Sequence, residues 1–274
     1  MKQENSAFIS FGQQTEGIIF DDSSNPKYPI KYYNVINGNG VKINPDNSYF
    51  GYVYSGVVVI KRSFLPIQYL SKGQYFSLSG QFWIMEHITD GEDVVEVDGK
   101  AIVIEVINDG YYKETNYKAY ATFGGPIEAT GRLKYIDGCT DSLLISPVKK
   151  GAPCLNHLHF PNSIDQTQHT HPSHRIGIVA SGYGECITPF GNLPLTESMI
   201  FVIKQWDGEE FSKGLDGEAY PNGQHAFKTF DDVMNVIAFH PDSDFGPEDE
   251  FHPMINRTIV NGVSANKIQD IMTK

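Results

Sequence analysis

The sequence predicts an all-β protein that folds into two β-barrels with few helices. Its 274 residues are enough for two domains of about 100 to 150 residues each. Short runs of β-branched and aromatic residues recur along the chain, and Gly, Asn, Asp or Pro bounds each of them. Helical periodicity is nearly absent. Together these observations favour a sandwich or barrel architecture.

The predicted strands follow the aromatic and β-branched runs in chain order. They cover residues 52–60, 75–84, 101–106, 117–122, 143–146, 175–180, 199–203 and 234–239. One helix is expected, at residues 264–272, because Ile268 and Met272 lie four positions apart and so share a helical face.

Two stretches resemble copies of one plan, in which a strand bounded by Gly is followed by an aromatic-rich strand and a hairpin. Residues 73–78 belong to the first stretch, and residues 182–186 with 197–203 belong to the second. Such repetition predicts two barrels joined near residues 124–150. We therefore expect an N-terminal domain at residues 1–125 and a C-terminal domain at residues 126–274.

The composition excludes several classes of partner. Thirty-three acidic residues against 21 basic ones give a formal net charge of −12, and no segment gathers Lys or Arg. Nucleic acids and anionic membranes both require basic surface, so neither is expected as a partner. No apolar run approaches the ~20 residues of a membrane span, and no secretory signal is recognisable near the start. Cys139, Cys154 and Cys186 form no CxxC pair, so we expect free thiols and a cytoplasmic location.

Histidines gather in the C-terminal half, where eight of the nine lie after residue 156. The densest group holds His169, His171 and His174. Residues two apart on a strand share a face, so His169 and His171 are expected to aim both imidazoles at one point inside a barrel. Imidazole is a common ligand of divalent cations. The pattern predicts a metal site, with His174 as an additional candidate ligand if Pro172 introduces a bulge.

Residues 169–182 resemble the first motif of the cupin superfamily, in which HxH is followed by Glu and then by Gly. His169 and His171 supply the HxH, Arg175 stands at the Glu position, and Gly182 falls at the Gly. Ser163 stands where the motif has an earlier Gly.

Residues 221–225 resemble the second cupin motif, PxGxxHxxxN. His225 comes one residue early, and Thr229 stands at the Asn position. The resemblance implies two cupin barrels, each a double-stranded β-helix or jelly roll, with a metal in the second barrel held by the HxH pair and His225. The first barrel has His87 as its one histidine, so it is expected to be free of metal.

Arg175 at the Glu position changes the expected chemistry. A guanidinium stays protonated and cannot bind a cation, so three neutral histidines would hold the metal. Three-histidine iron sites occur among cupin-like dioxygenases that act on thiols and diketones. The resemblance therefore implies a non-haem Fe(II) dioxygenase acting on a small polar or anionic metabolite, whose carboxylate Arg175 would orient. Zn, Mn, Ni and Co are alternative metals because imidazole suits several first-row ions.

Two other functions fit the same motif. The metal could polarise a carbonyl while a histidine moves a proton, as in an isomerase, epimerase or lyase. The barrel could also bind a small molecule without catalysis, since this type of fold hosts many functions. A small molecule is the expected partner in each case, and strand-edge pairing makes a homodimer a further candidate.

The remaining histidines have alternative interpretations. His240 follows the predicted strand 234–239 and is a candidate for moving a proton or for a fourth ligand. His157 and His159 share a strand face and are expected to line the same cavity, to form a second HxH, or to serve ordinary packing. The acidic residues 240–253 are expected to form a solvated loop, with a lid over the barrel mouth as the alternative.

Overall fold

A computed structural model describes residues 2–90, 93–147, 149, 151–243, 259–260 and 263–264. The chain divides into two compact units. The N-terminal unit comprises Phe11–Glu128 and Leu144–Ser146. The C-terminal unit comprises Met1–Ser10, Ala129–Leu143 and Pro147–Lys274, so the start of the chain belongs to the second unit. None of the helices in the described part of the chain has the length and apolar character that a membrane crossing needs.

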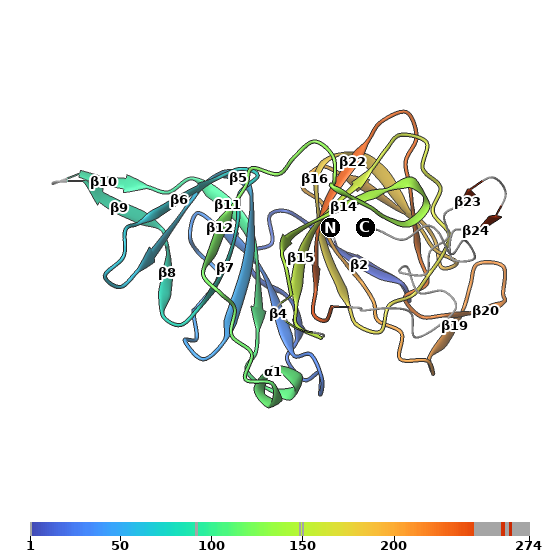
Figure 1. The fold of residues 1–274 in the computed structure, drawn as a ribbon, viewed down its shortest axis with the longest axis horizontal. Helices are drawn as coiled ribbons and strands as arrows, with labels where there is room; N and C mark the ends of the chain where they lie inside the picture. Colours follow the sequence, from blue (N-terminus) through green and yellow to red (C-terminus); the bar gives the residue numbers. More distant parts are fainter. Residues whose placement is uncertain are drawn as a thin grey trace. The chain divides into compact units, whose positions relative to one another are not determined.

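The N-terminal unit is built on an antiparallel sheet with the strand order β12-β7-β5-β11-β4-β3, and β6 and β8 also pair with β5 (Figure 1). A separate hairpin joins β9 and β10. The bounds are β3 Gly17–Asp22, β4 Ile30–Ile36, β5 Ser48–Arg62, β6 Gln68–Ser71, β7 Tyr75–Ser79, β8 Phe82–Met85, β9 His87–Asp90, β10 Asp93–Glu96, β11 Gly99–Val106, α1 Gly110–Glu114 and β12 Thr122–Gly124.

The C-terminal unit is built on a ten-stranded sheet with the order β1-β2-β18-β16-β22-β15-β14-β13, and β17 and β21 also pair with β16. The hairpins β19-β20 and β23-β24 lie outside this sheet. The bounds are β1 Gln3–Glu4, β2 Phe8–Phe11, β13 Leu133–Lys134, η1 Ile136–Gly138, β14 Thr140–Ile145, β15 Cys154–Phe160, β16 Arg175–Ile187, β17 Leu193–Thr196, β18 Ile200–Ile203, β19 Phe211–Lys213, β20 Ala219–Pro221, β21 Ala226–Lys228, β22 Met234–His240, β23 Ile259–Val260 and β24 Val263–Ser264.

The two units repeat one plan of strand pairing. The first half of β5 pairs with β7 and β11, and its second half pairs with β6 and β8. Strand β16 does the same with β18 and β22, and then with β17 and β21. Each long strand turns at a glycine with positive φ, Gly56 at 60° and Gly182 at 81°. A Cβ at either glycine would lie 1.9 Å from a backbone carbonyl oxygen, so the close approach requires glycine.

The all-β prediction is confirmed, and most predicted strands lie within observed ones. Residues 75–84 form two strands, β7 and β8, rather than one. The strand expected at 117–122 is wrong, because the backbone before β12 forms hydrogen bonds with side chains. Ser48 Oγ accepts a hydrogen bond from the amide of Ala119, and Ser77 Oγ donates one to the carbonyl of Tyr120. Helix α1 was not predicted, because five residues capped by Asp109 are too short to show a periodicity. Ser264 ends β24, and the rest of the expected helix 264–272 lies outside the described residues.

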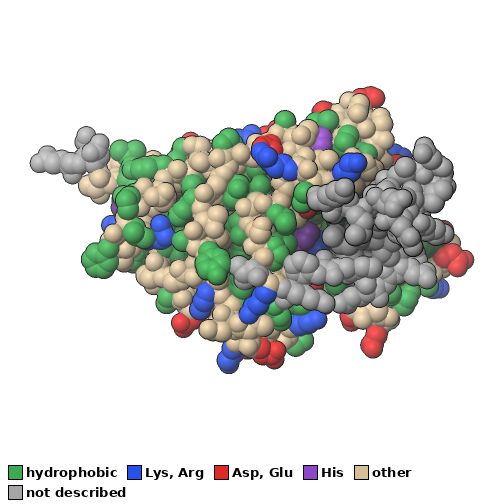
Figure 2. All heavy atoms as spheres, in the orientation of Figure 1, with side chains coloured by type: hydrophobic (Ala, Val, Ile, Leu, Met, Phe, Trp, Pro, Cys, Tyr) green, Lys and Arg blue, Asp and Glu red, His purple; other side chains and the backbone are tan. Residues whose placement is uncertain are grey.

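Aromatic and aliphatic side chains fill the C-terminal unit around the inner faces of β15, β16, β18 and β22. Phe160, Phe201, Val236 and Ala238 belong to this core. Alternate residues contribute to it, Leu158 and Phe160 from β15 and Met234, Val236 and Ala238 from β22, because side chains alternate between the two faces of a strand. On the face of the molecule shown in Figure 2, lysine and arginine side chains are scattered and form no single basic patch.

Candidate metal centre

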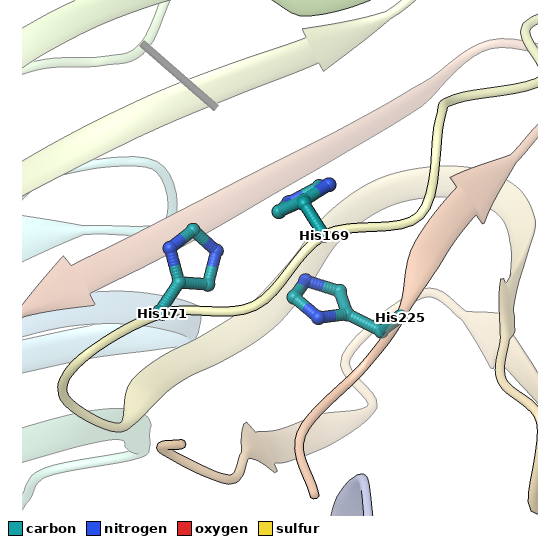
Figure 3. Close-up of side chains that lie close together, drawn as sticks. All are labelled: His169, His171 and His225. Atoms are coloured by element: carbon teal, nitrogen blue, oxygen red, sulfur yellow. The ribbon is translucent and has the colours of Figure 1, made fainter. Parts of the chain in front are cut away.

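Three histidines from two distant stretches of the chain meet in the C-terminal unit. His169 and His171 lie on the extended segment before β16, and His225 directly precedes β21 (Figure 3). Their ring centroids are 4.5 to 5.3 Å apart. One nitrogen of each ring lies within 4.8 Å of the others, and all three side chains are buried. The structure thus brings together the three histidines that the sequence selects as metal ligands.

A short antiparallel bridge sets this meeting point. The amide of His169 donates a 2.9 Å hydrogen bond to the carbonyl of His225, and the amide of His225 donates a 3.0 Å bond in return. A second bridge pairs Asp165 with Lys228. Residues opposite each other in such a pair place their side chains on the same face, which explains why the imidazoles of His169 and His225 are neighbours.

Backbone carbonyls fix the tautomer of two of the rings. His169 Nδ1 lies 2.9 Å from the carbonyl oxygen of Thr167, and His225 Nδ1 lies 2.8 Å from that of Gly223. A carbonyl only accepts, so each Nδ1 must carry the proton and donate. The Nε2 of each ring then keeps its lone pair, which is the atom a metal requires.

Burial favours the neutral form of His225. His225 is 1% exposed, and the pKa of its imidazole lies well below 6.5, first because burial disfavours the charged form and second because His169 stands beside it. The hydrogen bond to Gly223 opposes this shift, and the charge of Arg175 adds to it. Three buried imidazoles with one nitrogen each within 4.8 Å of the others fit a divalent first-row metal ion.

A small cavity lies against the histidines. It has about 30 Å³ of room for the centres of water-sized molecules, which is space for about two waters. Its wall is mostly apolar, and its few polar residues include Gln166, Arg175 and His240. The apolar residues of the wall are Leu158, Phe160, Ile176, Phe201, Ile203, Phe227, Val236 and Ala238. Such a wall excludes bulk water from the ring nitrogens.

Arg175, the first residue of β16, lines this cavity and is engaged in an ion pair. Its Nη1 lies 2.9 Å from Asp242 Oδ1. Ser173 Oγ donates a 2.6 Å hydrogen bond to the same carboxylate oxygen, and Arg175 Nη1 also contacts that hydroxyl. Arg175 thus lines the cavity, and the carboxylate of Asp242 compensates its charge.

His240 and His174 take different positions. His240 ends β22 and lines the cavity, which is the position that a residue moving a proton there requires. His174 lies outside the three-histidine group, and its Nδ1 accepts a 3.0 Å hydrogen bond from the amide of Gln205. Burial lowers the pKa of His174 to about 4.

His157 and His159 do not line the cavity. Leu158 and Phe160, their neighbours on β15, do line it, so the two histidines face the other side of the strand. Both donate to one acceptor, because His157 Nε2 and His159 Nδ1 lie 2.8 and 2.9 Å from Asn235 Oδ1. Of the alternatives open from the sequence, ordinary packing describes this pair.

Two positions, Ser163 and Thr229, depart from the cupin motif. Ser163, at a Gly position, has a φ of 59°, the left-handed conformation for which glycine is the usual residue. Thr229, at the Asn position, accepts a 2.9 Å hydrogen bond from the amide of Ile164. The side chain of Thr229 thus helps to join the segment after His225 to the segment before His169.

Gln166 and Asp242 were missed as residues of the site. Gln166 is 5% exposed, lines the cavity, and its side chain accepts a 3.2 Å hydrogen bond from the amide of Phe227. Asp242 is 6% exposed and lies 67 positions from its partner Arg175. Local sequence carries no sign of either contact. The loop or lid expected at 240–253 lies mostly outside the described residues, because residues 244–253 are not among them.

Comparisons with known proteins identify the fold. No family model matches the sequence, and no curated protein matches it. A Pseudomonas aeruginosa protein named as glyoxylate-induced is similar in structure with a TM-score of 0.58 and 9% identity, over 92% of this chain and 95% of that one. The Ylba protein of E. coli, described with the family model DUF861, is similar with a TM-score of 0.53 and 13% identity, over 88% and 93%.

At these identities the likeness shows the fold, and it extends over both units of the chain. The repeated strand pairing, the HxH segment before β16 and the histidine before β21 agree with it. The chain therefore has the cupin fold, a jelly roll present in two units.

Proposed function

We propose that His169, His171 and His225 hold one divalent metal ion and that the protein is a non-haem Fe(II) dioxygenase for a small polar or anionic metabolite. The observation that carries the proposal is the convergence of three buried imidazoles, two of them with Nδ1 bound to a carbonyl. A bound iron(II) would supply Lewis acidity and the capacity to react with dioxygen.

The chain's own residues would bind and orient the substrate. Phe160, Phe201 and Phe227 form an apolar wall that keeps water from the reacting atoms. Arg175 would contact the anionic part of the substrate, and His240 would hold or accept a proton. Because the cavity has room for about two waters, a small chelating group fits it.

His240 supports a second candidate function. A histidine at the cavity, opposite a metal that polarises a carbonyl, is what a redox-neutral isomerase, epimerase or lyase requires. Oxygen consumption separates the two activities. Turnover that continues unchanged under argon would support the redox-neutral reaction and exclude the dioxygenase.

The N-terminal unit is proposed to bind no metal. Glu105 is buried on β11, where its carboxylate accepts hydrogen bonds of 2.7 Å from Tyr33, 2.8 Å from Tyr49 and 2.7 Å from Asn47. Three donors on one carboxylate stabilise the interior of that unit and leave little capacity for a cation.

Metal analysis of the purified protein tests the main proposal. We expect close to one equivalent of a first-row metal, or its uptake after incubation with Fe(II), Co(II) or Zn(II). Less than about a tenth of an equivalent, with no uptake on reconstitution, would exclude a metal-dependent activity. A non-catalytic binding barrel would then be the remaining function.

A further inference from the structure

The ion pair between Arg175 and Asp242 is buried on both sides. The two side chains are 6% and 9% exposed, and Nη1 of Arg175 lies 2.9 Å from Oδ1 of Asp242. Ser173 supports the same carboxylate oxygen through its hydroxyl. Each partner of this buried pair stabilises the charge of the other, because either one alone would be an uncompensated charge in a medium of low polarity.

The pair is oriented relative to the cavity. Arg175 lines the cavity and Asp242 does not, so the positive end of the pair faces the space beside the histidines. Imidazoles that bind a metal ion are neutral, so Asp242 decides whether the wall carries a net positive charge.

We propose that Asp242 determines which ligand charge the metal site accepts, by compensating the guanidinium of Arg175 at the cavity wall. The inference rests on the proposed function, because it requires a metal on His169, His171 and His225. With Asp242 in place, the metal ion is the main uncompensated charge of the site. The substrate class is then a small chelator whose anionic oxygen the metal ion itself binds, because the compensated guanidinium adds no net charge for a further anionic group.

The test uses the full chain loaded with Co(II) and two probes that bind an open metal position. Azide carries a negative charge, and imidazole above its own pKa carries none. The dissociation constant of each probe is measured from the visible absorption of Co(II). In Asp242→Asn, which keeps the shape of the side chain, we expect azide to bind about tenfold more tightly and imidazole to bind as in the wild type.

Two further variants make the charge argument specific. Arg175→Gln leaves the carboxylate uncompensated, so azide should bind about tenfold more weakly. The double variant Arg175→Gln with Asp242→Asn removes both charges and should return azide affinity to the wild-type value. If Asp242→Asn does not fold, Arg175→Gln carries the same test with the opposite sign. Asp21→Asn, which removes a carboxylate 3.9 Å from Lys31 in the N-terminal unit, is the matched control and should change neither probe.

The outcomes separate this inference from the proposed function. Azide and imidazole affinities that shift together, or azide affinity that stays constant in both single variants, would overturn the role of Asp242 while leaving the metal site intact. Failure of the wild type to take up Co(II) would overturn the proposed function, and the role of Asp242 with it.

Discussion

His169 and His225 exchange both backbone hydrogen bonds, at 2.9 and 3.0 Å, although 56 positions separate them. This bridge fixes the distance between the HxH segment and the third histidine through the backbone. The imidazoles are therefore held together by main-chain geometry, before any ion contributes. The arrangement leads to predictions on metal affinity, on pH, on a buried carboxylate and on the cavity.

His225→Ala should lower the affinity for Co(II) or Zn(II) by at least about a hundredfold, because one of three ligands is lost while the backbone bridge remains. Competition with a chromophoric chelator measures the affinity. His87→Ala, on β9 of the N-terminal unit, is the control and should bind metal as the wild type does. Equal affinities in all three proteins would place the ion elsewhere.

Stability of the metal-free protein should decrease as the pH falls from 6.5 toward 4. The folded-state pKa of His174 is lowered to about 4 and that of His225 lies well below 6.5, in both cases chiefly through burial. The unfolded chain therefore binds protons in this window that the folded chain does not, and unfolding is favoured. Full stability from these groups is present above pH 6.5, the ordinary pKa of histidine.

Substitution His174→Gln tests the contribution of one of these rings. An amide oxygen can still accept from the amide of Gln205, but it does not titrate. We expect the loss of stability between about pH 7 and pH 5 to become smaller by about 1 to 3 kcal/mol. Urea unfolding at the two pH values measures it. An unchanged pH dependence would assign the effect to other groups.

Asp141→Asn should stabilise the protein above pH 6. Burial raises the pKa of Asp141 to about 6, although Asn156 donates a 2.8 Å hydrogen bond to its Oδ2. Within the described structure, Oδ1 of Asp141 and Oδ1 of Asn156 have no hydrogen-bond partner. A neutral amide removes the cost of a buried charge and offers a donor to Asn156.

The expected gain for Asp141→Asn is about 1 to 3 kcal/mol at about pH 8. It should shrink as the pH falls below 6, because the wild-type carboxyl is then protonated in the folded state. Thermal unfolding at both pH values is the measurement, with Asp141→Ala as the control that should destabilise. A destabilising effect of Asp141→Asn at high pH would contradict the argument.

Ala238→Leu should block the cavity without removing the metal. Ala238 lines the cavity opposite Gly177, and three additional carbons would fill the space that has room for about two waters. We expect probe binding or turnover to fall at least about tenfold while metal content stays constant. Metal analysis and azide titration of one preparation give both numbers. Unchanged azide affinity would show that ligands reach the metal by another route.

The fold class could be predicted from the sequence because strand signals are local. Alternating aromatic and β-branched residues between turn residues are enough to place β5, β11, β16 and β22. The strand expected at 117–122 failed for a tertiary reason, since the side chains of Ser48, Ser77 and Ser79 bind the backbone there instead of a neighbouring strand. Only the surrounding fold decides between those two ways of satisfying backbone groups.

The sequence by itself determined that His169 and His171 point the same way, because alternation along an extended backbone is a property of two residues. The tertiary structure decided that this pair lines the cavity, whereas His157 and His159, with the same spacing, are buried on the other side of β15 and bind Asn235. It also joined Arg175 to Asp242. Which face of a strand lines the cavity, and which distant carboxylate compensates a charge, depend on packing between segments that no local pattern records.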